Sequence, residues 1–517
     1  MTAIEESTPA AAATVERGGG RLSRTLAWSY VYTAGGYLIT ALLQLGLAAV
    51  LTPRQFGVMT LAMLWVTLAL VLLEHGPTMA VIQHNDITED HLDAAFWSTV
   101  GGAVVFTLLF IAITPLWAAA NGLPEMIPVC LALAPVILLS AINVIPDAVL
   151  NRKLAMKTIA VRVLAAGLAG GLAGLGAALA GAGVWALVTQ QLVTPVVAAF
   201  LLWRITPWRP RRPRWAVLKP ALIDIRTTSL QTISGSIGNF IATRSDAIIM
   251  GQFLGPTAIG QYRFAQRFSQ MALDISARGL QQVSLPELAR HNADNRLLAA
   301  NLRRLVHLGM LFSTPVLAIL AASAESFANF IGPQWADATT PLRILCAFFA
   351  ISVIGNLLAP GLQAAQRPGL PALFTWIAAG LNLAGMLLAV WLTRDDAGIT
   401  RLVAIAVAAF LGEFAITVAM IWVTYRRVLR VPVRTLLVPL IPVVLVGGIT
   451  YGVGYAFEEL LPGGINSFLR LVIVGSAAAV TAGTALVLLD SVVRQKVVTV
   501  ITNRRARSSG PATPPAT

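Results

Sequence analysis

Charge is scarce in this chain, and so are polar segments long enough to form a soluble domain. Only 12% of the 517 residues are charged and 57% are hydrophobic, whereas a soluble domain carries about a quarter charged residues. Apolar stretches recur along nearly the whole sequence, and a bilayer core about 30 Å thick needs about 20 apolar residues for each helical crossing. The scarcity of charge therefore excludes an ordinary soluble fold and predicts an all-α polytopic membrane protein.

Cysteine, histidine and catalytic motifs are also sparse. The two cysteines, Cys130 and Cys346, lie inside apolar runs, which favours packing roles over a disulfide framework or redox chemistry. The five histidines include no HExxH pair, and the chain has neither a Walker lysine loop nor a GxSxG turn. The connecting loops are too short for a separate catalytic domain. We therefore expect no enzymatic activity, no metal and no cofactor.

The apolar stretches predict about fourteen transmembrane helices. Their ranges are 25–50, 57–80, 95–119, 127–148, 157–181, 183–203, 222–253, 258–283, 305–328, 341–363, 371–393, 401–425, 435–457 and 467–489. An even number of crossings places both ends of the chain on one side of the membrane. We expect disordered cytoplasmic tails at 1–24 and 491–517, and the first of these lacks the short apolar region of a signal peptide.

The distribution of basic residues predicts the orientation. With the N-terminus in the cytoplasm, the inside segments carry 26 Lys and Arg residues, whereas the outside loops carry three, Arg54, Arg394 and Arg401. Such a bias is typical of proteins of the cytoplasmic membrane. It also accounts for the net charge of +14 without a nucleic-acid partner. The inside segment 81–94 is an exception, because it holds four acidic residues and no Lys or Arg.

A basic, proline-rich segment divides the chain. The segment 204–221 holds six Lys and Arg residues, together with prolines that preclude a regular helix. We predict an N-lobe of six helices at 25–203, a cytoplasmic linker at 204–221, a C-lobe of six helices at 222–430 and two further helices within 431–490. Two equal helical halves are typical of a transporter with its site at their interface. The similarity between the halves is too weak to define an internal repeat.

The informative residues are ionisable groups inside the predicted helices, each of which costs about 2.5–3.5 kcal/mol at a helix centre. In the span 258–283, Arg267, Asp274 and Arg278 follow Arg263 by 4, 11 and 15 residues, which places all four within a helical sector of roughly 60°. Gln270 lies near the same stripe. The other faces carry large apolar residues, Phe264, Phe268 and Leu273. A stripe of this kind should line water or pair with another helix.

Further ionisable groups lie in other spans. Arg226 and Arg244 are 18 residues apart, five helical turns, so a straight helix places both on one face; Asp246 lies on another face. The remaining candidates are Glu74, Asp147, Arg162 and Glu413.

These groups have two interpretations, which the sequence leaves open. They can form structural ion pairs between helices, or the arginines can line a cationic cavity for an anionic substrate, because a guanidinium suits phosphate oxygens. The diphosphate of a lipid-linked sugar would suit such a cavity. The carboxylates Glu74, Asp246, Asp274 and Glu413 are candidates for ion coupling or for structural pairing.

Four short segments carry a family pattern. They are 51–62 (LTPRQFGVMTLA), 74–83 (EHGPTMAVIQ), 244–268 (RSDAIIMGQFLGPTAIGQYRFAQRF) and 331–345 (IGPQWADATTPLRIL). In this order they resemble the first outer turn, the end of the second helix, the seventh-to-eighth helix segment and the ninth-to-tenth helix segment of Wzx-like polysaccharide flippases. With fourteen spans, the resemblance extends over about residues 20–490.

The resemblance implies the superfamily that also contains MATE drug exporters and the lipid II flippase. It implies two six-helix lobes around a central cavity, with alternating access that exports an undecaprenyl-diphosphate-linked oligosaccharide for an exopolysaccharide or O-antigen-type glycan. By position in the matching segment it makes Arg244, Arg263 and Arg267 candidates to meet the diphosphate. Arg278 joins them through the helical stripe, and Arg226 through its face shared with Arg244.

The expected setting is the cytoplasmic membrane, with both termini inside. The expected partners are the lipid-linked oligosaccharide and membrane lipids, with a glycan polymerase and glycosyltransferases as further candidates. One alternative function is a MATE-like cation-coupled antiporter of small molecules, which needs buried carboxylates rather than an arginine wall. Another is a scaffold for glycan assembly that transports nothing.

Overall fold

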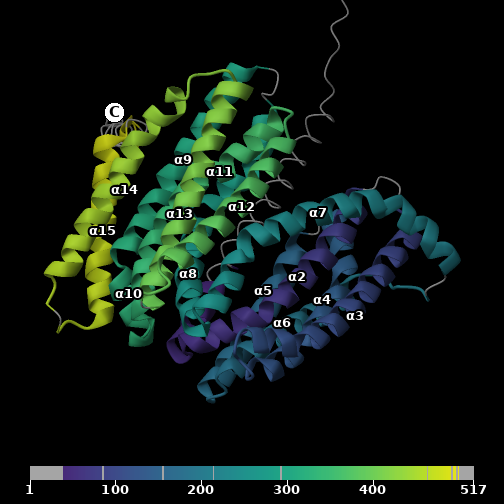
Figure 1. The fold of residues 1–517 in the computed structure, drawn as a ribbon. Coiled ribbons are helices and arrows are strands. Elements are labelled where there is room, and N and C mark those ends of the chain that lie inside the picture. Colours follow the sequence, from purple (N-terminus) through teal and green to yellow (C-terminus); the bar gives the residue numbers. More distant parts are fainter. Residues whose placement is uncertain are drawn as a thin grey trace, which may run out of the picture. The chain divides into compact units, whose positions relative to one another are not determined.

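The computed structural model describes residues 36, 39–83, 87–153, 156–212, 215–290, 294–396, 398–462, 464–490, 493–495 and 499. Within these residues every regular element is a helix (Figure 1), which confirms the all-α prediction. In the same part of the chain, eleven helices are long and apolar enough to cross a membrane. The figure of fourteen crossings stays a prediction.

The chain forms two compact units, which we call unit 1 (1–260) and unit 2 (261–517). Unit 1 contains a helix at Ile39–Val50 and then α2 (Pro53–Gln83), α3 (Glu89–Ala120), α4 (Met126–Arg152), α5 (Met156–Leu179), α6 (Val184–Ile205) and α7 (Trp215–Phe253). Helix α8 (Pro256–Ala289) begins in unit 1 and continues into unit 2 after Gly260.

The rest of unit 2 follows α8. Its elements are α9 (Asn295–Ala322), α10 (Ala324–Ile331), η1 (Pro333–Ala338), α11 (Thr339–Ala364), α12 (Gly369–Leu392), α13 (Gly398–Trp422), η2 (Val423–Val428), α14 (Arg434–Leu460) and α15 (Ser467–Leu489). The span expected at 305–328 is therefore two helices, because the chain breaks at Ser323 between α9 and α10.

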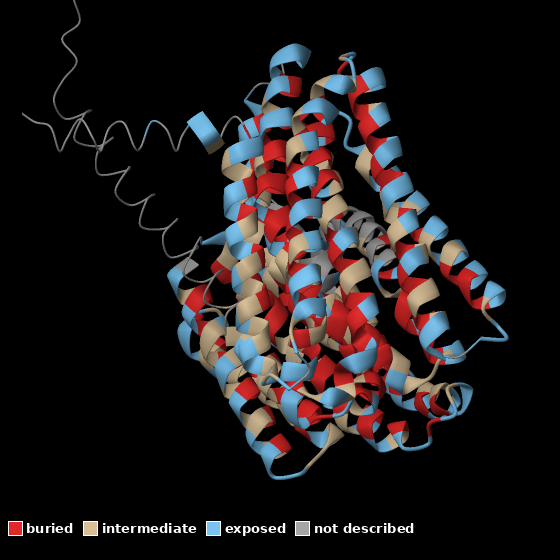
Figure 2. Ribbon diagram, turned by 90° about the vertical axis from the view of Figure 1, so that its left-hand side faces the viewer, coloured by how far each residue is buried: buried red, intermediate tan, exposed pale blue. Residues whose placement is uncertain are grey.

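The helices bury some faces and expose others that are also apolar. Buried and exposed positions alternate along the helices in Figure 2. On α12 the large side chains of Leu373, Trp376, Leu388 and Trp391 are all exposed. Helices that are apolar on their outer faces as well as their inner faces are typical of proteins surrounded by lipid.

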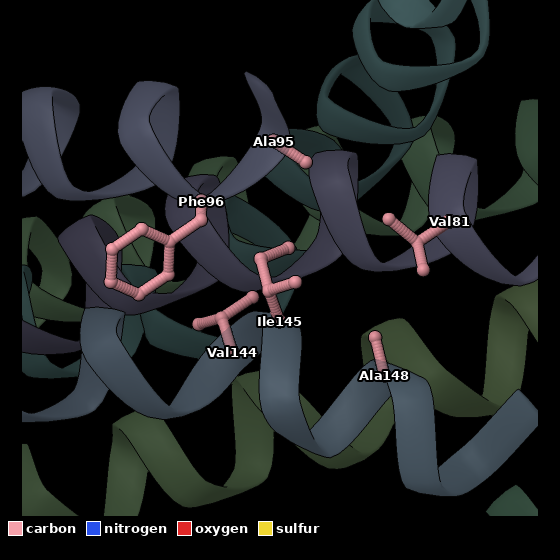
Figure 3. Close-up of a cluster of buried hydrophobic side chains, with 6 residues drawn as sticks. All are labelled: Val81, Ala95, Phe96, Val144, Ile145 and Ala148. Carbon is pink, nitrogen blue, oxygen red and sulfur yellow. The ribbon is translucent and has the colours of Figure 1, made fainter. Parts of the chain in front are cut away.

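Unit 1 is held by α2, which packs against α4 and α7, by α3 against α4 and by α5 against α6. One core cluster joins three of these helices: Val81 of α2, Ala95 and Phe96 of α3, and residues 144, 145 and 148 of α4 (Figure 3). Three tryptophans surround Phe96 edge-on, with ring centroids 5.4–6.0 Å away: Trp97, Trp203 and Trp208. This cluster fixes the ends of α3 and α6 next to the basic linker.

The linker is shorter than the sequence suggests. Helix α6 ends at Ile205 and α7 begins at Trp215, before the expected residue 222. Helix α7 packs on α2 and α3, so it belongs to unit 1. The proposed division into lobes at the linker stays a prediction.

Candidate functional site

The apolar face of α8 determines which side of this helix points into unit 2. The ring of Phe264 stacks on Trp335, with centroids 4.4 Å apart and planes at 18°. Phe268 meets Phe327 edge-on at 5.0 Å, and the Ser269 hydroxyl lies 3.4 Å from the Cys346 sulfur. Because Phe264 and Phe268 are both buried, this face of the helix points into the packed part of unit 2.

The charged residues of α8 lie away from that face, as the helical periodicity predicts. The side chains of Arg267 and Arg278 are exposed, and those of Arg263, Gln270 and Asp274 are half-buried. Apolar residues of the same helix, such as Leu273, are buried. One side of α8 is therefore polar for about four turns.

Two members of this stripe pair with each other. The Nη1 atom of Arg278 lies 3.1 Å from Oδ1 of Asp274, one turn earlier. The side-chain amide of Gln270 donates to the same oxygen at 3.2 Å. Arg278 and Asp274 therefore form an ion pair within one helix rather than between two helices.

The two other arginines of the stripe, Arg263 and Arg267, differ in their hydrogen-bond partners. The Nη1 atom of Arg263 donates to the side-chain oxygen of Gln266. Arg267 has neither an ion pair nor a hydrogen bond within the described part of the chain. An exposed guanidinium without a counter-charge can accept a ligand anion without first breaking an internal bond.

The candidates on α7 lie in unit 1. Arg244 is half-buried and Asp246 is buried, with Oδ1 of Asp246 accepting the backbone N–H of Ala247 at 2.7 Å. The side chain of Arg226 lies outside what the structure describes, although its backbone is in α7. Arg263 and Arg267 belong to unit 2, so the placement of the α7 residues in one site with them stays a prediction.

The remaining carboxylates have separate surroundings. Glu74 is exposed on α2. Glu413 of α13 is half-buried and has no ion pair within the described residues. It faces Gly355 of α11, where a Cβ atom would lie 3.8 Å from the Glu413 Oε1 atom and 3.7 Å from the Thr417 hydroxyl. In the described part of the chain, no group of His, Cys, Asp and Glu residues could hold a metal ion.

Arg162 and Asp147 form a structural ion pair. Nη2 of Arg162 on α5 lies 2.5 Å from Oδ1 of Asp147 on α4, and the arginine side chain is only 10% exposed. The Asn151 amide also donates to the Asp147 side chain, at 3.4 Å. These charges join two helices of unit 1.

The acidic segment 81–94, which does not fit the positive-inside pattern, contacts the basic linker through Arg211. The sequence analysis did not predict this contact. Arg211 forms ion pairs with Glu89 and Asp90, and its backbone N–H donates to Oδ1 of Asp93 at 3.3 Å. The indole N–H of Trp97 donates to the Arg211 carbonyl at 2.8 Å. The opposite charges of 81–94 and 204–221 were a signal that could have revealed this contact.

Comparison with known proteins identifies the family. A family described as "Polysaccharide biosynthesis protein" matches residues 47–340. The chain belongs to this polysaccharide biosynthesis protein family. The match confirms the resemblance to Wzx-like flippases drawn from the four segments, and the chain is a multi-pass membrane protein of this class.

Two relatives and one solved structure show how far the likeness extends. The succinoglycan biosynthesis transport protein ExoT of Rhizobium meliloti (strain 1021) is 25% identical over 330 residues, 63% of this chain and 65% of the relative. The lipopolysaccharide biosynthesis protein WzxC of Escherichia coli (strain K12) is 21% identical over 62% of this chain and 65% of the relative. The match thus spans about two thirds of their length, slightly less in each case.

The fold is similar to that of the lipid II flippase MurJ in an inward closed conformation. The TM-score is 0.69, with 12% identity over 89% of this chain and 98% of MurJ. At this identity the likeness concerns the fold alone.

Proposed function

We propose that this protein is a flippase that moves an undecaprenyl-diphosphate-linked oligosaccharide from the inner to the outer leaflet of the cytoplasmic membrane, for an exopolysaccharide or O-antigen-type glycan. Two lobes would expose the site alternately to each side. Both termini would lie in the cytoplasm, because the basic residues gather on that side. The family and the names of the relatives support this class of substrate.

The observation that carries the proposal is Arg267, exposed and without an internal partner on the polar side of α8. A charge in hydrocarbon costs about 2.5–3.5 kcal/mol, so such a residue is tolerated where it meets water or an anion. A guanidinium binds two phosphate oxygens at once through its planar fork. The sugars of the substrate would occupy the wet space while the lipid tail stays in the bilayer.

The other arginines have graded roles in this proposal. Arg263 lies one turn from Arg267 and would meet the same diphosphate after releasing Gln266. Arg278 is held by Asp274, so it would contribute less. Arg244 and Arg226 would supply positive charge from α7.

The test removes single charges. In a deletion strain, lipid-linked glycan should accumulate on the cytoplasmic face, and the wild-type gene should restore surface glycan. Arg267→Gln should lower export by about tenfold or more, since a hydrogen bond to a charged group is worth about 1.5–3 kcal/mol, while membrane levels stay normal. The matched control is Arg54→Gln, an exposed arginine outside α8 whose charge is also removed. Full complementation by Arg267→Gln would refute the site.

One observation favours the second candidate, a cation-coupled antiporter of small molecules. Glu413 is a half-buried carboxylate without an ion pair in the described part of unit 2, as such a site requires. Under this alternative, deletion would cause drug sensitivity with unchanged surface glycan, and Glu413→Gln would reproduce the drug phenotype. Flipping of lipid-linked glycan by the purified protein in liposomes would exclude both the antiporter and a scaffold that transports nothing.

A further inference from the structure

The N-termini of α2 and α8 carry the same short sequence pattern, although the two halves show no overall repeat. Residues 51–57 read Leu-Thr-Pro-Arg-Gln-Phe-Gly, and residues 254–260 read Leu-Gly-Pro-Thr-Ala-Ile-Gly. In both segments a leucine is followed by a proline two residues on and by a glycine one helical turn after that. Each proline is the first residue of its helix, where its fixed backbone angle and missing N–H are favourable.

The two patterns touch each other reciprocally within unit 1. A Cβ atom on Gly57 would lie 2.5 Å from the carbonyl carbon of Pro256, and a Cβ on Gly260 would lie 2.5 Å from the carbonyl carbon of Pro53. Each glycine therefore packs on the proline of the other helix. A contact that maps onto itself when its two halves are exchanged is the signature of a two-fold relation. We call the contact of Pro53, Gly57, Pro256 and Gly260 the glycine crossing.

The glycine crossing is a close backbone contact that no polar bond between its four described residues holds together. Its neighbours Val58 and Ile259 are buried, so the two backbones meet without a solvent gap. Within the described residues, no hydrogen bond or ion pair joins Pro53 or Gly57 to Pro256 or Gly260. Glycine contributes no side chain to the contact, and weak C–H···O approaches are worth at most about 1 kcal/mol each. A contact of this kind can seal a path and still separate without breaking a hydrogen bond or an ion pair between the four residues.

The position of the crossing connects it to the proposed site. Helix α8 runs from the crossing into unit 2, and Arg267 follows Gly260 by seven residues, or about 10 Å along the helix. The charge pattern of the sequence predicts that the starts of α2 and α8 lie on the outer side of the membrane. Separation of the crossing would therefore move the start of α8 away from α2 on the side to which the substrate is released.

We infer that the glycine crossing is the outer gate of the transport path, closed when the backbones of α2 and α8 touch and opened when they part. The inference rests on the proposed flippase function. Glycine is required at both positions because any side chain would overlap the opposite carbonyl group. An alanine at either position would hold the gate partly open.

The first experiment leaves both glycines in place. Arg54 and Thr257 are exposed and directly follow the two prolines, so Arg54→Cys and Thr257→Cys can be joined by a short bis-maleimide. The two native cysteines are buried and give the background. We expect the cross-linked double variant to lose at least 90% of its flipping activity in liposomes, whereas each single variant, treated in the same way, keeps it. Flipping at the control rate after complete cross-linking would overturn the gate.

The second experiment measures the gate without transport. Val58→Cys places a thiol beside the crossing, and an impermeant maleimide added from outside should label it slowly. Adding Gly57→Ala or Gly260→Ala should raise the labelling rate at least threefold, while Gly101→Ala, where a Cβ would meet nothing within 4 Å, should not. Unchanged labelling in glycine variants that reach the membrane would overturn the gate.

The two experiments separate the two proposals. If the alanine variants fail to reach the membrane, the cross-linking result decides. If the protein without a cross-link flips no lipid-linked glycan, the proposed function fails, and the labelling rates still decide whether the crossing opens.

Discussion

Unit 1 and unit 2 each hold an arginine inside a predicted membrane helix, and the two arginines differ in burial and in ion pairing. In unit 1, Arg162 is almost buried and lies 2.5 Å from Asp147 on the neighbouring helix. In unit 2, Arg267 is exposed and has no partner in the described part of the chain. The same residue type therefore stabilises the fold in unit 1 and, in our proposal, binds an anionic ligand in unit 2.

The difference has a physical basis. Two paired charges cancel most of the field that would make each of them costly in a membrane, so the pair is a stable part of the structure. An unpaired charge keeps that cost unless water or a ligand meets it. Removal of Asp147 should therefore damage stability, and removal of the Arg267 charge should damage transport.

The largest effect should follow from breaking the pair in unit 1. Asp147→Asn leaves Arg162 without a counter-charge and should destabilise the protein by about 3–5 kcal/mol, seen as lower membrane levels and a lower Tm in detergent. The double variant Asp147→Asn with Arg162→Gln should recover most of the loss. Equal Tm values for the single variant and the wild type would show that the pair is not structural.

A smaller effect is expected from a change of shape at constant charge in unit 2. Arg267→Lys keeps the positive charge but loses the two-pronged geometry, so flipping should fall about three- to tenfold, with Tm unchanged. The matched control is Arg278→Lys, where the pair with Asp274 can re-form. A Tm drop as large as that of Asp147→Asn would mean that Arg267 has a structural partner.

The smallest effect should come from the exposed contact of the linker. Arg211 and Glu89 are both more than 60% exposed, and exposed pairs contribute at most about 1 kcal/mol. Arg211→Glu should therefore change Tm little but speed proteolysis of the linker, and adding Glu89→Arg should reverse that. If the double variant is cleaved as fast as the single one, the linker is not held by these charges.

Local patterns in the sequence were sufficient for the all-α class and for the polar side of α8, whereas the fourteen crossings stay a prediction. The length of an apolar run and the helical period are properties of one segment, so they place Phe264 and Arg267 on different faces of α8 without knowledge of the neighbouring helices. The segments α7 and α8 are absent from the eleven helices that qualify as spans within the described residues. Both helices carry charged residues that lower their mean hydropathy, among them Arg244 in α7 and Arg267 in α8.

Tertiary contacts could not be derived in this way. The sequence named Asp147 and Arg162 but not their pairing, because it depends on how α4 and α5 pack. The contact of Arg211 with Glu89 joins residues 122 positions apart. The break at Ser323 separates two apolar segments that form one continuous run in the sequence. The glycine crossing depends on how the N-terminus of α2 packs on the N-terminus of α8, which the sequence of neither segment contains.

Equilibrium binding of undecaprenyl diphosphate to the purified protein measures whether Arg267 binds an anionic lipid head. We predict that Arg267→Gln binds at least tenfold more weakly than the wild type, and that Arg54→Gln binds equally well. Equal affinities for the wild type and Arg267→Gln would show that Arg267 does not bind the lipid head.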